Sequence, residues 1–152
     1  MTVRQINARD LIFQVSDMDP TTPTWTAIGG LLTGTISYDE NEEKTDTTTW
    51  DSEGHYEEEK MQVGASLSLE GRLLQDPATG VRDPGQELVE AHGELLGYDS
   101  QVAVRFRYPG ATNWKAWMAT VSVGEQGGGT NDKSGWAAEF TRCGAPALVA
   151  VV

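Results

Sequence analysis

The stretch Val63-Gly64-Ala65-Ser66-Leu67-Ser68-Leu69-Glu70 decides the fold class of this chain. Its larger apolar side chains stand at every second position, and glycine, serine or glutamate fills the positions between them. A period of two is typical of a β-strand that has one buried and one exposed face. The chain also contains 17 glycines, which favours many short strands joined by tight turns. We therefore expect a mainly β protein.

Six further segments have the character of strands. They are residues 10–15, 25–28 and 32–38 before the central stretch, and residues 102–108, 117–123 and 136–140 after it. In residues 102–108 the apolar side chains share one face, while Arg105 and Arg107 lie on the other. The same alternation places Trp117 and Trp136 on buried faces, whereas Trp114 is expected at the surface.

One segment, residues 83–96, carries the signals of a helix. Asp83 can cap the first turn, Pro84 suits the first helical position, and Gln86 stands three residues after the cap. The apolar stripe expected on this helix consists of Leu88, Ala91 and Leu95. A helix this short is marginal alone, so we expect the stripe to pack on a sheet. The order of the elements predicts a β-sandwich or small barrel with one flanking helix.

A long acidic segment interrupts the strands between residues 39 and 59. Ten acidic residues against Lys44 alone give it a net charge of −9. Mutual repulsion and the shortage of apolar residues predict a long exposed loop. Large aromatic side chains in a solvated loop favour a partner surface. The candidate contact residues of this loop are Asp39, Glu42, Glu43, Trp50, Tyr56 and Glu58.

Two interpretations of the acidic loop stay open. It is either a plain solvated loop or a contact arm whose charge meets basic groups such as Arg105 or Arg107 on a neighbouring subunit. The apolar tail from Leu148 to Val152 would be unusual in water, so it indicates an interface segment. The candidate subunit-interface residues are Arg105, Arg107, Leu148, Val149 and Val151.

Length and charge narrow the possible classes of function. A chain of 152 residues suits a single domain over residues 1–152. Its net charge of −12 argues against tight nonspecific binding to nucleic acid and against an anionic membrane surface. No run approaches the roughly 18 apolar residues that span a bilayer. The amino terminus lacks the apolar core of a signal peptide, so we expect folding in a cytoplasm.

No catalytic or metal-binding constellation stands out in the sequence. His55 lies in the acidic loop and His92 on the predicted helix, where ordinary exposed or half-buried positions are expected. Cys143 has no local signature of a nucleophile. The acids of residues 39–59 lack the spacing of a calcium loop. We therefore expect no enzyme activity, no cofactor and no metal site.

Across most of its length the chain resembles the major tail tube proteins of long, non-contractile-tailed bacteriophages. The likeness lies in the order and spacing of its segments and in the chain length. The segments are Trp25–Gly30, Thr33–Ser37, the long polar loop, Gly64–Gly71, the helix Pro84–Leu95, and Gly135–Phe140 closing on Gly144-Ala145-Pro146.

The resemblance implies two packed antiparallel sheets, sandwich-like or barrel-like, flanked by one α-helix. It further implies six-membered rings that stack into a tube, through which double-stranded DNA passes without specific binding. The other implied partners are the tape-measure protein and further tail proteins. The implied location is the virion tail, after assembly in the cytoplasm of the bacterial host. By position, residues 39–59 would contact the adjacent ring, while residues 1–9 and 145–152 would be terminal arms.

Other classes of function stay open beside the tail tube. One is another tail component, such as a tail terminator or the tube protein of a contractile injection system. Another is a stand-alone β-sandwich that binds carbohydrate on exposed tryptophans. The tryptophans available for stacking are Trp25, Trp50, Trp114, Trp117 and Trp136. The expected burial of Trp117 and Trp136 argues against this last class.

Overall fold

Seven antiparallel strands form the main sheet, in the order β2-β1-β7-β8-β9-β6-β3. The structure is a computed structural model that describes residues 1–151. The strands are β1 (Ile12–Ser16), β2 (Trp25–Ala27), β3 (Leu31–Ser37), β6 (Ser66–Arg72), β7 (Gln101–Arg107), β8 (Asn113–Val123) and β9 (Gly135–Ala150). The sheet is not a closed barrel, because β2 and β3 form its two edges. The predicted class, mainly β with one α-helix, is confirmed.

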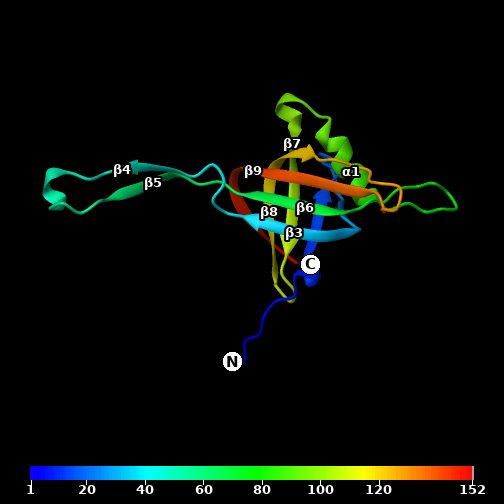
Figure 1. The fold of residues 1–152 in the computed structure, drawn as a ribbon, viewed down its shortest axis with the longest axis horizontal. Helices are drawn as coiled ribbons and strands as arrows, with labels where there is room; N and C mark the ends of the chain where they lie inside the picture. Colours follow the sequence, from blue (N-terminus) through cyan, green and yellow to red (C-terminus); the bar gives the residue numbers. More distant parts are fainter. Residues whose placement is uncertain (152) are drawn as a thin grey trace.

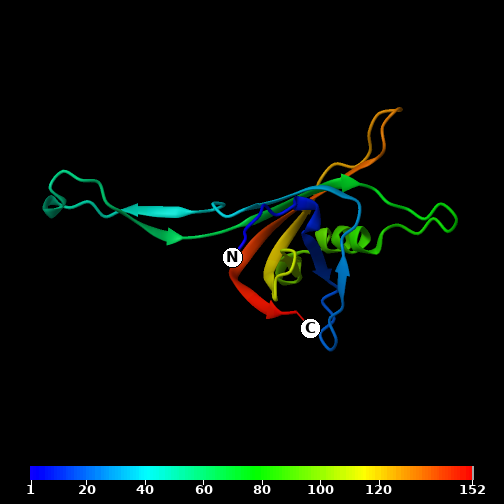
Figure 2. The same ribbon diagram turned by 90° about the horizontal axis from the view of Figure 1, so that it is seen from below.

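The sheet curls so strongly that its two halves face each other. Figure 1 shows β3, β6 and β9 crossing in front of β7 and β8, and Figure 2 shows the curl from below. Gly34 in β3 lies at a contact between the halves, because a Cβ built there would be 2.9 Å from Cζ of Phe13 in β1. The two packed sheets that the resemblance implies are therefore two halves of one hydrogen-bonded sheet.

The hydrophobic core lies between these halves, and strand alternation places its side chains there. In β6, Leu67 and Leu69 are fully buried, while Ser68 and Glu70, which alternate with them, are exposed. The core residues are Phe13, Val15, Ile28, Ala65, Leu67, Leu69, Val89, Val104, Phe106, Trp117, Ala119, Trp136, Ala138 and Phe140. Because apolar area removed from water stabilises by about 25 cal/mol per Å², this cluster is the main source of stability. The predicted burial of Trp117 and Trp136 is correct, since they are 3% and 2% exposed.

A bend in β9 carries the chain from one half of the sheet to the other. The register between β8 and β9 shifts between Ala116 and Met118, where three residues of β9 lie opposite one residue of β8. Gly144 in this bulge has φ +76°, a left-handed conformation that favours glycine. After the bend, Ala147 to Ala150 pair with the beginning of β8. The expected C-terminal arm is thus the end of β9 over residues 145–150, and Val152 lies outside the described residues.

The helix α1 (Pro84–Gly93) closes one end of the curled sheet and packs on β8, β1 and β2. Its capping follows the sequence prediction, since the Asp83 carboxylate accepts a hydrogen bond from the Gln86 backbone N–H at 3.1 Å. Its buried face differs from the predicted stripe, because Leu88 is only half-buried while Ala91 and Leu95 are exposed. The helix instead buries Gly85, Gln86, Val89 and His92. Because the buried face includes the polar side chains of Gln86 and His92, it could not be recognised from the spacing of apolar residues.

The remaining elements are short. They are the 3₁₀ turns η1 (Ala8–Asp10), η2 (Trp50–Ser52) and η3 (Gly97–Ser100), and a two-stranded sheet of β4 (Glu43–Asp46) and β5 (Glu58–Gln62). Residues 1–7, expected as most of an N-terminal arm, are exposed and precede η1. Within residues 1–151, no helix is long and apolar enough to cross a bilayer.

Candidate assembly surfaces

Residues 39–62 form an arm that projects far from the body of the protein (Figure 1). The sequence predicted an irregular loop for most of this segment, whereas the structure has an antiparallel hairpin of β4 and β5. The hairpin continues toward its tip, where the Thr47 N–H donates to the Glu57 carbonyl at 3.0 Å. At the tip, Thr49 and Ser52 cap η2 reciprocally. Local hydrogen bonds therefore order a segment that has no core of its own.

Two cross-strand ion pairs offset part of the repulsion within the arm. Lys60 Nζ lies 2.9 Å from a Glu42 carboxylate oxygen, and this hydrogen bond raises the pKa of Lys60. Lys44 Nζ lies 3.5 Å from a Glu58 carboxylate oxygen. Both pairs are on the surface, where such contacts add little stability. Because an isolated two-stranded hairpin is marginal in water, the arm is suited to docking on another surface.

The six predicted contact residues all lie on the arm, but at different distances from the body. Asp39 is at the base and accepts a hydrogen bond from the Ser37 hydroxyl at 2.9 Å. Tyr56 donates its hydroxyl to Glu58 at 3.0 Å, which raises the pKa of Tyr56. Trp50 is at the tip and is 95% exposed. An indole this exposed is the strongest single indication of a binding anchor on the arm.

Arg105 and Arg107 lie at the far end of β7, on the face of the sheet that points away from the core. The Arg105 guanidinium is stacked between the rings of Trp25 and Trp114, with its Cζ 4.2 Å from each centroid. It also donates two hydrogen bonds, of 2.8 and 2.6 Å, to the Gln14 side-chain carbonyl. Burial, followed by the like charge of Arg107, lowers the pKa of Arg105. Arg105 is thus largely engaged within its own subunit.

The predicted surface position of Trp114 is wrong, since Trp114 is only 7% exposed. The Arg107 guanidinium lies 5.0 Å from its ring centroid, and Arg105 covers it as well. Cation–π stacking buries an indole on a face that alternation alone assigns to solvent. With Trp114, Trp117 and Trp136 all buried, the stacking platform required by a carbohydrate-binding module is largely absent from the described residues.

A pocket of about 140 Å³ opens at the arm end of the body, between β8 and the end of β9. We call it the mouth pocket, and its lining residues are Tyr38, Lys115, Trp117, Arg142, Pro146, Ala147 and Leu148. The Lys115 ammonium lies 5.1 Å from the Tyr108 ring centroid, and the Arg142 guanidinium lies 5.7 Å from that of Trp117. Partial burial, then the neighbouring Tyr108 hydroxyl, raises the pKa of Tyr38, so this phenol stays protonated. The pocket therefore combines hydrogen-bond donors, two cations and apolar walls.

The predicted interface residues of the C-terminal tail gather at this same end of the body. Leu148 lines the mouth pocket and is 70% exposed, and Val149 pairs with Trp114 on the opposite face. The Val151 N–H donates to the Thr112 carbonyl at 2.9 Å. Lys115 and Arg142 are not among the interface residues predicted from the sequence. Both extend the alternating patterns of their strands, with Lys115 two residues before Trp117 and Arg142 two after Phe140.

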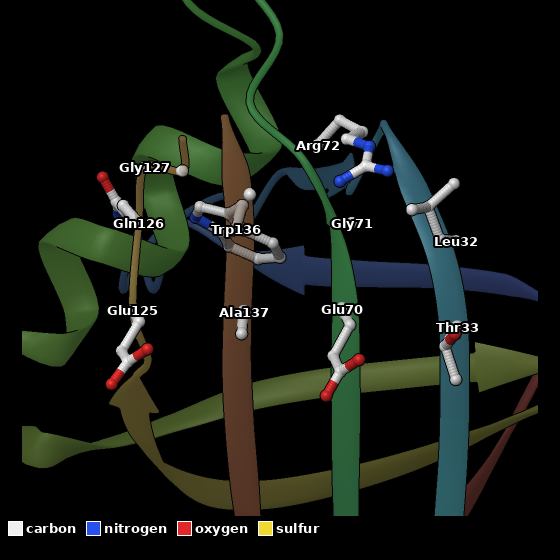
Figure 3. A pocket seen from close by; sticks show the side chains of 12 residues that line it. Leu32, Thr33, Glu70, Gly71, Arg72, Glu125, Gln126, Gly127, Trp136 and Ala137 are labelled. Atoms are coloured by element: carbon white, nitrogen blue, oxygen red, sulfur yellow. The ribbon is translucent and has the colours of Figure 1, made fainter. Parts of the chain in front are cut away.

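The outward face of β3, β6, β9 and β8 is polar and carries no cation among its central residues. We call it the polar face, defined by Thr33, Thr35, Ser68, Glu70, Thr120, Ser122, Ala137, Glu139 and Thr141. Figure 3 shows Thr33, Glu70 and Ala137 in a row across neighbouring strands, with Glu125 beyond them. A hollow of about 430 Å³ lies at the end of the polar face next to Glu125, with the Arg72 side chain at its border (Figure 3).

The described residues do not assemble a metal centre. Within residues 1–151, no group of three or more His, Cys, Asp or Glu side chains is placed to hold a metal ion. His92 is 6% exposed and its Nε2–H donates to the Ser16 carbonyl at 2.7 Å, which fixes the end of α1 to β1. This histidine has a structural contact and lies away from the arm and the mouth pocket.

Comparison with known proteins bears on the fold. No family model and no curated protein matches the chain. A chain from the tail of an empty gene transfer agent particle with C6 symmetry is 21% identical, with a TM-score of 0.67, and the match covers 95% of this chain and 98% of that one. A chain from the virion of a native gene transfer agent particle is 20% identical, with a TM-score of 0.66 and the same coverage. At these identities the likeness is one of fold, and it extends over nearly the whole of each chain.

Proposed function

We propose that this protein is a structural subunit of a phage-type tail, in which six-membered rings stack into a tube that conducts double-stranded DNA. The observation that carries the proposal is the fold likeness, over 95% of the chain, to a protein in a tail of C6 symmetry. The role is structural and requires no catalytic residue, cofactor or metal. The open sheet, the arm and the polar face each have a use in such an assembly.

The open edge of β3 supports association into closed rings. Its seven residues contain no proline and no charged side chain, the features that usually protect an edge strand from pairing. Ring closure by identical copies is a common way to cover such edges. The arm then extends beyond the body, where it can contact a copy in the adjacent ring.

The polar face supports the role of a conduit. Strong nonspecific attraction to DNA comes from lysine and arginine contacts to phosphates, and each such contact adds a term that depends on salt. The polar face offers small hydroxyls and the carboxylates of Glu70 and Glu139 instead. A lumen lined by this face would let DNA pass without holding it.

The proposed role also defines the partners and the location of the protein. Its main partner is itself, and tape-measure and other tail proteins would contact the ends or the interior of the tube. It would assemble in the cytoplasm of the bacterial host and reside in the virion tail. DNA would pass through the tube without being bound specifically.

Negative-stain electron microscopy of the concentrated protein, alone and seeded with an initiating tail complex, tests the proposal. The expected product is a hollow tube built from stacked rings. Single rings that never stack would instead indicate a tail terminator. Protein that stays monomeric in both conditions, together with virions that lack the chain as an abundant component, would overturn the proposal.

A further inference from the structure

The mouth pocket holds two cations that lack an acidic partner in their own subunit. Among residues 1–151 the ion pairs are Lys44–Glu58, Lys60–Glu42 and Arg82–Glu90, so neither Lys115 nor Arg142 has a carboxylate within 4 Å. The Nε atom of Arg142 is also buried without a hydrogen-bond partner. In a chain with a net charge of −12, cations without an acidic partner beside a pocket indicate a binding site for an anionic group from another molecule.

The size and walls of the mouth pocket fit an aromatic side chain. Its volume is about 140 Å³, and a protein cavity of roughly 150 Å³ accepts a benzene ring. Tyr38 and Trp117 supply aromatic walls, and Leu148 supplies an exposed aliphatic one. The preferred occupant is therefore an aromatic ring that has carboxylates beside it.

The tip of the arm has this composition. Trp50 is 95% exposed and is followed by Asp51 and Glu53, both exposed and neither in an ion pair within the described chain. We propose that the mouth pocket of one subunit receives the arm tip of a second copy of this chain, with Trp50 in the pocket and the tip carboxylates beside Lys115 and Arg142. This inference rests on the proposed function, because it requires copies stacked along the arm.

The geometry of the arm favours a contact between subunits over one within a subunit. Tyr38 lines the pocket and stands immediately before the base of the arm, so the tip points away from the pocket of its own subunit. From Ser37 to Trp50 an extended chain spans about 40 Å. A globular body of this chain's size is about 38 Å across. In a stack of copies, each tip can therefore reach the corresponding pocket of the next copy.

Disulfide trapping in assembled protein tests this placement directly. In a Cys143→Ser background, Asp51→Cys is combined with Leu148→Cys at the mouth pocket or, as a control, with Leu96→Cys. Leu148 and Leu96 are 70% and 87% exposed, so each thiol is accessible. Oxidised tubes with the Leu148 variant should give a ladder of covalent multimers on non-reducing gels, and the Leu96 variant should not. Equal ladders, or no ladder from otherwise normal tubes, would overturn the inference.

Charge reversal gives a second test that does not depend on thiols. Lys115→Glu should raise the protein concentration needed for stacking about tenfold, which is the effect expected from about 1.4 kcal/mol per contact. Lys133→Glu makes the same change in charge in an exposed turn and should leave stacking unchanged. Adding Asp51→Lys to Lys115→Glu should restore part of the loss. If Lys115→Glu stacks normally, the proposed docking site is wrong, but the proposed tail-tube function is not contradicted. If the unaltered protein forms no rings or tubes, the proposed function itself is wrong.

Discussion

Gln86 is a side chain whose structural role the sequence did not reveal. Its Nε2 donates to the carbonyls of Gly29 at 3.0 Å and Arg72 at 2.7 Å, and its Oε1 accepts from the Leu74 N–H at 3.2 Å. Gln86→Leu would remove these three hydrogen bonds, which join the helix to two loops of the sheet. We expect a loss of about 2–4 kcal/mol in the free energy of unfolding, measured by urea denaturation. Gln5→Leu, at an exposed position, is the control, and a loss below about 0.5 kcal/mol for Gln86→Leu would contradict the assignment.

Glu90 makes the stability of the helix end depend on pH. Burial alone would raise its pKa, but hydrogen bonds from Arg82, at 2.7 and 3.1 Å, and from Gln126 outweigh burial and hold the pKa below its ordinary value of 4.5. A lowered pKa means that the stabilisation is present above pH 4.5 and is lost as the pH falls through the folded-state value. The melting temperature of the unaltered protein should therefore fall more steeply below pH 4.5 than that of Glu90→Gln. If the melting temperatures of the two proteins fall equally with pH, the Arg82–Glu90 ion pair does not contribute to stability.

Single residues also mark the limit of prediction from sequence. Alternation located Leu67, Leu69, Trp117 and Trp136 in the core, because burial on a strand follows a period of two. It failed for Trp114, whose burial depends on guanidinium groups from a neighbouring strand. It could not identify Gln86 as buried, because its partners lie 12 or more residues away in sequence.

Among the elements, the arm is the one that sequence patterns described least well. Its exposure and charge were predicted, but its pairing was not, since Thr45 faces Glu59 and Asp46 faces Glu58 without an apolar face to mark a strand. Strands with no buried face have no hydrophobic period, so their register is weakly specified by sequence. The pocket that we propose as the arm's docking site was also missed, because it forms only when the bend at Gly144 brings residues 146–148 beside Tyr38.

Replacing residues 42–62 with a short Gly/Ser linker tests whether the arm acts in assembly alone. The strands of the arm form their own two-stranded sheet and add no side chain to the core. The melting temperature of the shortened protein should therefore stay within a few degrees of the original, measured by circular dichroism. Stacking, measured by sedimentation and electron microscopy, should be lost. A shortened chain that still forms full tubes would remove the arm from the mechanism.

At the scale of the whole molecule, the uneven distribution of charge is the main physical feature. Of the net −12, the segment 39–59 carries −9, so the rest of the chain carries only −3. Lys115 and Arg142 lie beside the mouth pocket at the arm end of the body, while the central residues of the polar face offer carboxylates and hydroxyls. This separation suits the proposed polymer, in which the acidic arm of one copy would meet the cations of the next. The carboxylates of the polar face would then face the DNA, which is also negatively charged. The sequence alone could assign the charge to the loop but not the remaining acids to a face.

If the proposed tube forms with the polar face toward its lumen, a cation on this face should make the tube retain DNA. Glu139→Lys puts one lysine at the centre of the polar face of each subunit, and the proposed ring symmetry would repeat it along the tube. Short double-stranded DNA added before polymerisation should then sediment with the tubes at low salt and be released as salt rises. Glu94→Lys makes an equal change in charge at an exposed position after α1, and tubes of this variant should leave DNA in solution, as the unaltered protein should. If Glu94→Lys retains as much DNA as Glu139→Lys, or if neither retains any, the polar face does not line the lumen.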